Sequence, residues 1–256
     1  MKIAYIGIDL FYPALETLFA LGCEILEVFT CEVDNKTEFN CKVQNFAKEK
    51  NIPCQMTRIT RADIERLLEK GCEMAVCGGY YFKIPADTGL RIVNIHPSLL
   101  PVGRGSWPMA QAILWRHKKS GVTIHKIAEG FDTGDILLQK EFKISDDETH
   151  ETFMQKANLF ACDMLKELVS DFDFLYKNAR KQGEGEYWAA PKEEDYTIRW
   201  DMPFKDADII LRAFYGYECI YLGKDGSFTK IVGGRAIKSD DKTDKEYPLL
   251  DGFIEV

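Results

Sequence analysis

Three polar residues carry the side chains with which this sequence could perform acid–base chemistry. Asn94 and His96 follow an apolar run, and Asp132 lies downstream in the sequence Asp132-Thr-Gly134-Asp-Ile. An amide N–H can donate to a developing oxyanion, an imidazole titrates near neutrality and can relay a proton, and a carboxylate can orient or stabilise the charged imidazole. Taken singly, His96 could be a satisfied core histidine and Asp132 a turn carboxylate. The combination of the three favours a catalytic site.

The spacing of these residues indicates where they should lie. Side chains alternate along a strand, so Asn94 and His96 share one face of the strand that the apolar run predicts. Pro97 has no N–H and biases His96 toward an extended conformation, so the strand should end there. A second alternating strand is predicted at 121–127, followed by the loop that carries Asp132. We therefore expect the three side chains to gather at the carboxyl ends of the strands, where ligands bind in open α/β sheets.

The pair Asn-x-His and the later Asp-x-Gly-Asp-Ile together resemble the folate-dependent formyltransferases, a family that includes methionyl-tRNA formyltransferases, glycinamide ribonucleotide transformylases and sugar N-formyltransferases. The resemblance covers roughly residues 1 to 200 and has its sharpest motifs between 78 and 138. It implies an enzyme that uses Asn94, His96 and Asp132 as its catalytic trio. It also implies 10-formyltetrahydrofolate as the co-substrate, a primary amine as the acceptor, and no metal.

The resemblance also implies residues that bind the two substrates. The stretch 78–85 is similar to a wall of the folate pocket that makes backbone contacts. The predicted folate-binding residues are Gly79, Tyr80, Phe82, Ile84, Pro85, Gly130 and Phe131. The predicted acceptor-binding residues are Ser98, Arg104, Trp107 and His125. Of these, Arg104 either contacts an anionic group or is simply solvated, and His125 is either a pocket-wall residue or a packed one.

Strand and helix patterns alternate over the first two-thirds of the chain, which predicts an α/β fold with a mostly parallel, Rossmann-like sheet flanked by helices. By resemblance this is the formyltransferase fold. We expect a catalytic domain at 1–185 and a small α+β extension at 186–256. The G-x-G-x-x-G fingerprint and the Walker A sequence are missing. The sequence therefore lacks the motifs that usually indicate NAD or ATP as a cofactor.

Composition narrows the class of protein and of partner. The chain has 256 residues, a formal net charge of −8, and eight scattered cysteines without a C-x-x-C pair. It contains no apolar run of membrane-spanning length, and its first residues read as a strand rather than a secretion signal, so we expect a cytoplasmic protein without a membrane partner. The negative charge disfavours a nucleic-acid partner, because affinity for nucleic acid depends on cations that neutralise phosphates.

The predicted function is N-formylation of a small amine, most plausibly a nucleotide-linked amino sugar, because the C-terminal part is short and the chain acidic. The alternatives are a methionyl-tRNA formyltransferase with a shortened C-terminal domain, a formyltetrahydrofolate hydrolase, and a non-catalytic folate-binding protein. Lys83 and Arg104 are candidate phosphate partners. The aromatic residues that could either stack on a base or fill a core are Tyr187, Trp188, Trp200, Tyr215 and Tyr217. Homodimer formation is left open.

Overall fold

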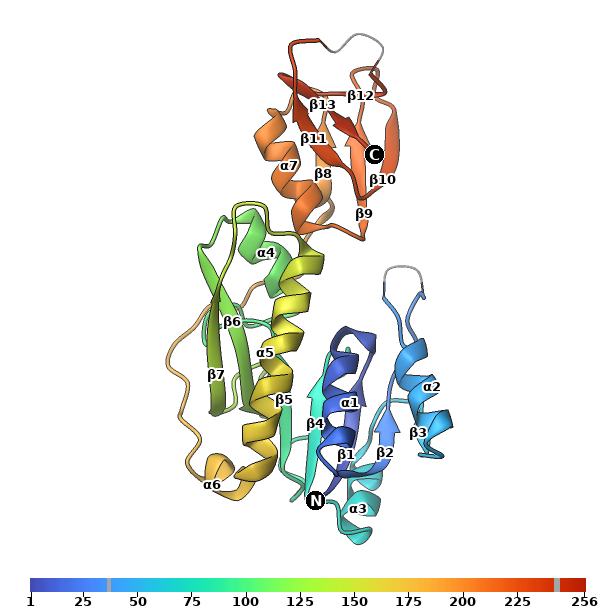
Figure 1. The fold of residues 1–256 in the computed structure, drawn as a ribbon, viewed down its shortest axis with the longest axis vertical. Coiled ribbons are helices and arrows are strands. Elements are labelled where there is room, and N and C mark those ends of the chain that lie inside the picture. The colour runs from blue at the N-terminus through green and yellow to red at the C-terminus, as the bar shows by residue number, and fades with distance from the viewer. Residues whose placement is uncertain (36–37, 242–244) are drawn as a thin grey trace. The chain divides into compact units, whose positions relative to one another are not determined.

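The sheet that positions the candidate residues is mostly parallel. A computed structural model of the chain describes residues 1–35, 38–241 and 245–256, and the largest sheet within them has seven strands in the order β3-β2-β1-β4-β5-β6-β7 (Figure 1). These strands are β1 Lys2–Gly7, β2 Glu24–Phe29, β3 Cys54–Gln55, β4 Met74–Gly78, β5 Ile92–His96, β6 Lys119–Lys126 and β7 Ile136–Lys143. All pairs among β1 to β5 are parallel, and β6 pairs antiparallel with β5. The prediction of a mostly parallel α/β sheet is confirmed.

Helices flank this sheet. They are the short 3-10 turn η1 Asp9–Phe11 and the helices α1 Tyr12–Ala20, α2 Cys41–Glu49, α3 Arg61–Glu69, α5 His150–Ser170 and α6 Phe172–Lys177. Helix α3 begins at a capping box, in which the Thr60 hydroxyl accepts from the Asp63 N–H and the Asp63 carboxylate accepts from the Thr60 N–H. Such a cap satisfies two backbone donors that the first helical turn would otherwise leave without partners.

The two faces of the sheet bury different helices. Ala4 and Ile6 of β1 share a core with Ile64 of α3, and Ile92 of β5 belongs to the same core. The intervening Tyr5 points to the other face, where its hydroxyl donates to the Phe11 carbonyl at 2.9 Å, directly before α1. Figure 1 shows α1 in front of the strands. Since residues at even spacing share a face, Asn94 and His96 lie on the Ile92 side of the sheet.

The chain separates into two compact units, each formed by three segments. The first unit contains 1–104, 121–142 and 156–187, and the second contains 105–120, 143–155 and 188–256. The predicted division into a catalytic domain at 1–185 and an extension at 186–256 stays a prediction. Among the described residues, none of the helices combines the length and the apolar character needed to cross a membrane.

The second unit is built from helices and two small sheets. Its helical elements are α4 Pro108–Leu114, α7 Phe204–Ala213 and the 3-10 turn η2 Glu193–Tyr196. One three-stranded sheet has the order β10-β9-β8, and the other has the order β11-β13-β12. The strands are β8 Thr197–Arg199, β9 Glu218–Leu222, β10 Phe228–Val232, β11 Arg235–Lys238, β12 Tyr247–Pro248 and β13 Gly252–Glu255. Helix α7 and the antiparallel hairpin of β9 and β10 both lie within the residues of the predicted α+β extension.

Candidate active site

Asn94 and His96 project from the last residues of β5. In the sheet, Asn94 lies opposite Cys77 of β4 and opposite His125 of β6. The strand ends at His96, directly before Pro97, as the sequence predicts. His96 is buried, and Asn94 is partly accessible. The strand therefore presents an amide at the surface of the site and an imidazole beneath it.

Asp132 reaches the same place from the loop between β6 and β7. Because β6 runs antiparallel to β5, its last residue, Lys126, lies opposite Val93 near the amino end of β5. Asp132 thus follows the carboxyl end of its own strand, β6, although its loop begins beside the amino end of β5. Its carboxylate nevertheless reaches Asn94 and His96.

The loop can fold back this way because of two backbone features. Asp132 has a φ of 55°, a left-handed conformation that Asp adopts more readily than most residues. At Gly134 a Cβ atom would lie 1.9 Å from the Lys126 carbonyl oxygen, so only glycine permits this close return to β6.

The four polar side chains of the site, those of Asn94, His96, His125 and Asp132, form one cluster. Asn94 Nδ2 lies 3.1 Å from His125 Nε2 and donates to Asp132 Oδ1 at 3.4 Å. The same Oδ1 lies 3.6 Å from His96 Nδ1 and 3.4 Å from His125 Nε2. The predicted trio is therefore brought together around one carboxylate oxygen, with His125 as a fourth member.

Backbone carbonyls set the tautomers of both histidines. His125 Nδ1 lies 2.8 Å from the Lys126 carbonyl, which can only accept, so the proton of neutral His125 sits on Nδ1 and Nε2 accepts from Asn94. His96 Nε2 lies 2.7 Å from the Gly103 carbonyl. Its proton therefore sits on Nε2, and the lone pair of Nδ1 faces Asp132.

Burial governs the titration of His96. Burial lowers the pKa of His96, while the Asp132 carboxylate, the hydrogen bond to Gly103 and the nearby His125 are smaller influences, the first two raising it and the last lowering it. The net direction is downward, so the ring is neutral near pH 7. A neutral imidazole whose free lone pair faces a carboxylate can accept a proton at Nδ1, and the carboxylate then stabilises the imidazolium.

A small cavity of about 70 Å³ opens beside this cluster. Its walls include five of the seven predicted folate-binding residues, namely Tyr80, Phe82, Ile84, Gly130 and Phe131. Gly79 and Pro85 do not line it, although Gly79 has a φ of 71° and its carbonyl accepts from the Ile8 N–H, which shapes the turn. Burial raises the pKa of the Cys77 thiol, which also lines the cavity and stays protonated.

His125 fulfils both alternatives left by the sequence, because it is 1% exposed and also lines the cavity. Lys83, a candidate phosphate partner, is an exposed wall residue. Ser98 is buried, and its hydroxyl donates to the Val102 carbonyl at 2.8 Å, so it braces the loop after β5. Trp107 belongs to the second unit, where its ring packs against Tyr217 at a centroid distance of 4.7 Å.

Arg104 is engaged with a residue that the sequence analysis missed. Its Nε and Nη2 donate to Gln182 Oε1 at 3.1 and 2.9 Å, and Nη2 also donates to the Gly183 carbonyl. The Gln182 Nε2 in turn donates to the carbonyls of Asp132 and Gly134 at 2.9 and 2.6 Å. Gln182 thereby ties the Asp132 loop to the loop that carries Arg104. Its position in a polar stretch remote in sequence gave no signal of this role.

The late aromatic residues divide between core and surface. Trp188 is buried within the second unit and contacts Trp115 and His117 at centroid distances of 4.8 and 5.3 Å. Trp200 and Tyr215 keep more than a third of their surface exposed, as does Tyr187 of the first unit.

Comparisons with known proteins agree with this geometry. A family model described as formyl transferase matches residues 30–169, more than half of the chain. A methionyl-tRNA formyltransferase of Treponema denticola is 36% identical over 142 residues, which cover 55% of this chain and 44% of that relative. A methionyl-tRNA formyltransferase of Thermodesulfovibrio yellowstonii is 30% identical, with 89% of this chain and 76% of the relative covered.

Among solved structures, a sugar N-formyltransferase from a Shewanella species is similar with a TM-score of 0.70 at 20% sequence identity. The match covers 91% of this chain and 96% of that one. At this identity the likeness concerns the fold, which is that of a formyltransferase.

Proposed function

The chain belongs to the formyl transferase family, whose reaction is folate-dependent formyl transfer, and we propose that it moves the formyl group of 10-formyltetrahydrofolate to the primary amine of a small acceptor. The observation that carries the proposal is the convergence of Asn94 and His96 on one carboxylate oxygen of Asp132 beside a cavity. A protein that only binds folate has no chemical need for all three groups.

The walls of the cavity suit the donor. The rings of Tyr80 and Phe82 make an edge contact at a centroid distance of 5.7 Å, and Phe131, which is 54% exposed, also lines the cavity. Ring faces that the protein itself leaves open can stack on a planar heteroaromatic group. The donor supplies a formyl carbon bonded to a nitrogen that departs when an amine attacks.

Each polar residue then has one part in the transfer. His96 accepts the proton of the attacking amine at Nδ1, directly or through water, and Asp132 stabilises the resulting imidazolium. As the bond between the formyl carbon and the donor nitrogen breaks, the imidazolium gives this proton to the departing nitrogen, which leaves as the N–H of tetrahydrofolate. The Asn94 N–H that donates to Asp132 Oδ1 at 3.4 Å in the structure turns to the oxyanion that develops on the formyl oxygen. His125 holds the Asn94 amide by accepting its other N–H, so the donor is already oriented before reaction begins.

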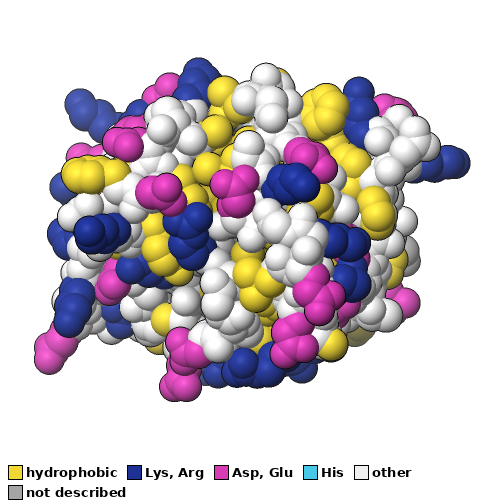
Figure 2. Space-filling view, turned by 90° about the horizontal axis from the view of Figure 1, so that it is seen from below, with side chains coloured by type: hydrophobic (Ala, Val, Ile, Leu, Met, Phe, Trp, Pro, Cys, Tyr) yellow, Lys and Arg dark blue, Asp and Glu magenta, His cyan; other side chains and the backbone are white. Residues whose placement is uncertain are grey.

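For the acceptor, we favour a nucleotide-linked amino sugar. The chain carries a net charge of −8, and on the face shown in Figure 2 Lys and Arg side chains are interspersed with Asp and Glu rather than gathered. A tRNA backbone requires many cations along its path, whereas a diphosphate requires few. The second candidate, methionyl-tRNA, is favoured by the names of the relatives that are 30% and 36% identical.

A direct test gives the purified chain 10-formyltetrahydrofolate together with either a panel of nucleotide-linked 3- and 4-amino sugars or initiator Met-tRNA, with products identified by mass spectrometry. We expect a formylated sugar and only a slight loss of rate between 50 and 200 mM salt, because few phosphates are neutralised. Formylation of Met-tRNA, at a rate that falls roughly a hundredfold or more over this range of salt, would instead identify methionyl-tRNA as the acceptor.

A further inference from the structure

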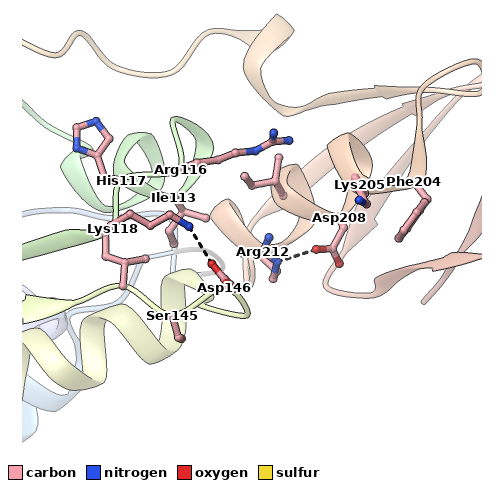
Figure 3. Close-up of a pocket in the computed structure, with 12 residues that line it drawn as sticks. Ile113, Arg116, His117, Lys118, Ser145, Asp146, Phe204, Lys205, Asp208 and Arg212 are labelled. Carbon is pink, nitrogen blue, oxygen red and sulfur yellow. Dashed lines mark hydrogen bonds and ion pairs between the residues drawn. The ribbon is translucent and has the colours of Figure 1, made fainter.

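A second cavity, of about 420 Å³, lies wholly within the second unit, and nothing in formyl transfer requires it. It is formed by the end of α4 and the turn that follows it, by residues 144–146, and by α7 (Figure 3). Its volume falls within the range of about 300 to 1,000 Å³ that is common for small-molecule sites. It is large enough for a mononucleotide and too large for a lone phosphate ion.

Part of the lining is apolar. Ile113 of α4, Ile144 and Ile209 of α7 are all buried, and each lines the cavity. Phe204, the first residue of α7, is half-buried and adds an aromatic side chain. Such a surface can take up the ring of an organic ligand.

The remainder of the lining is charged, with an excess of cations. Four cationic side chains, Arg116, Lys118, Lys205 and Arg212, line the cavity together with two carboxylates, Asp146 and Asp208. This local excess contrasts with a whole chain of net charge −8. It favours an anionic ligand over a neutral or cationic one.

One of these cations is fixed. Arg212 pairs with Asp208 at 2.8 Å and donates to the Glu148 carbonyl at 2.9 Å, and only 19% of its side chain is exposed. Arg212 therefore links α7 to the segment before α5 and forms a fixed part of the pocket wall. Figure 3 shows its pair with Asp208.

The other three cations are exposed and can bind a ligand. Lys118 pairs with Asp146 at 3.0 Å and Arg116 with Asp206 at 2.8 Å, and every one of these side chains is more than half exposed. Lys205 is exposed and has no ion-pair partner within the described parts of the chain. Ion pairs this exposed contribute little to stability, so a phosphate dianion can replace these carboxylates at small cost.

We propose that this pocket binds an organic phosphate of mononucleotide size, with the phosphate on Arg116, Lys118 and Lys205 and the ring against the apolar lining. The ligand is either a free nucleotide or the nucleotide end of the acceptor, and only the second case rests on the proposed function. A concave site with carboxylates in its wall suits one nucleotide better than a nucleic-acid strand, whose backbone would meet Asp146 and Asp208.

The test is calorimetric titration of the full chain with AMP, UMP, dTMP and inorganic phosphate at low and moderate salt. We expect at least one nucleotide to bind more tightly than inorganic phosphate, and more weakly as salt rises. The variant Arg116→Ala/Lys205→Ala should weaken this binding at least tenfold while the circular dichroism spectrum is unchanged.

A matched control exists in the same unit. Arg235 pairs with Glu255 at 2.7 Å in an exposed ion pair, and Lys238 is an exposed lysine of the same strand. Arg235→Ala/Lys238→Ala removes the same two kinds of charge and should leave nucleotide binding unchanged. The proposal is overturned if no nucleotide binds the wild-type chain, or if both double variants bind equally well.

Kinetics separate the two sources of the ligand. If the pocket holds the acceptor's nucleotide, the pocket variant should raise the KM for a nucleotide-linked amino sugar at least tenfold with kcat unchanged, and the free nucleotide should compete with that acceptor. If the ligand is a free nucleotide, that KM should not change although calorimetric binding is lost. Because calorimetry needs no turnover, it tests the pocket even if every amino sugar fails as an acceptor.

Discussion

The cavity beside Asp132 and the pocket beside Arg116 both present polar or charged side chains to a ligand. The two regions differ in how these side chains are held in place. In the first, His96 and His125 are buried, and each has one ring nitrogen at a backbone carbonyl and the other at Asp132. In the second, Arg116 and Lys118 hold exposed carboxylates that water can replace.

The difference teaches what each arrangement is suited to do. Groups that must act on a developing charge have to be oriented before the reaction, and mutual hydrogen bonds inside a buried cluster achieve this. Groups that only capture a charged ligand can stay flexible and exchange partners. Substitutions in the first region should therefore change kcat, and those in the second should change binding.

The largest effect is expected at the trio. Asn94→Ala, His96→Ala and Asp132→Asn should each lower kcat by about a hundredfold or more, because each removes a group that acts on charge or a proton in the transition state. Folate binding, measured by fluorescence titration, should be nearly unchanged. Asp135→Asn is the control: it lies in the same loop but pairs with Lys126 at 3.4 Å. An equal loss in the control would show that loop disruption, rather than the trio, explains the result.

A smaller effect is expected when the hydrogen bonds from Gln182 to the Asp132 loop are removed. Gln182→Ala removes two donors to the carbonyls of Asp132 and Gly134 and the acceptor of Arg104. We expect kcat to fall roughly tenfold, because Asp132 is no longer held at its distance from His96. Arg180→Ala, which removes one contact of 3.3 Å to Gln139, should be close to wild type. Unchanged kcat in Gln182→Ala would mean that the Asp132 loop holds its position without help.

The pH dependence of kcat/KM tests the protonation state of His96. Since burial lowers the pKa of His96, and the neutral ring is the active form, the acidic limb of kcat/KM should have its midpoint below the ordinary histidine value of about 6.5. A midpoint above 6.5 would mean that Asp132 outweighs burial and that His96 enters the reaction protonated.

The smallest effect concerns stability in the second unit. Burial lowers the pKa of His150 to about 4, and within the described residues its Nε2 has no hydrogen-bond partner. Below pH 6.5 the unfolded chain binds a proton that the folded chain does not, so stability should fall by about 3 kcal/mol as the pH drops from about 6.5 to below 4. Urea unfolding of His150→Phe should show a flatter dependence over this window than His117→Phe, a half-buried histidine. Identical slopes would exclude this account.

Much of the fold and of the cluster could be predicted because local sequence determines them. The alternation through Asn94 and His96, the stop at Pro97 and the helix signals between strands each follow from one short segment. The Asp-x-Gly-Asp-Ile motif marked the loop that carries Asp132, and the structure explains its glycine, because a Cβ atom at Gly134 would lie 1.9 Å from the Lys126 carbonyl oxygen.

What could not be predicted depends on contacts between segments far apart. The antiparallel direction of β6, which brings Asp132 in from the amino end of β5, is set by pairing across the sheet. The partnership of Arg104 with Gln182 joins residues 78 positions apart, so the sequence left Arg104 open as an anion contact. The same holds for the histidine tautomers, which depend on the carbonyls of Gly103 and Lys126.

The central claim, that Asp132 and its partners transfer a formyl group, is tested most directly by a single-turnover experiment with 10-formyltetrahydrofolate and the acceptor identified in the panel. Wild type, Asp132→Asn and Asp135→Asn are compared at saturating donor. The account predicts rapid formyl transfer in the wild type and Asp135→Asn, and a rate at least a hundredfold lower in Asp132→Asn with donor affinity preserved. Transfer by Asp132→Asn at the wild-type rate would contradict it.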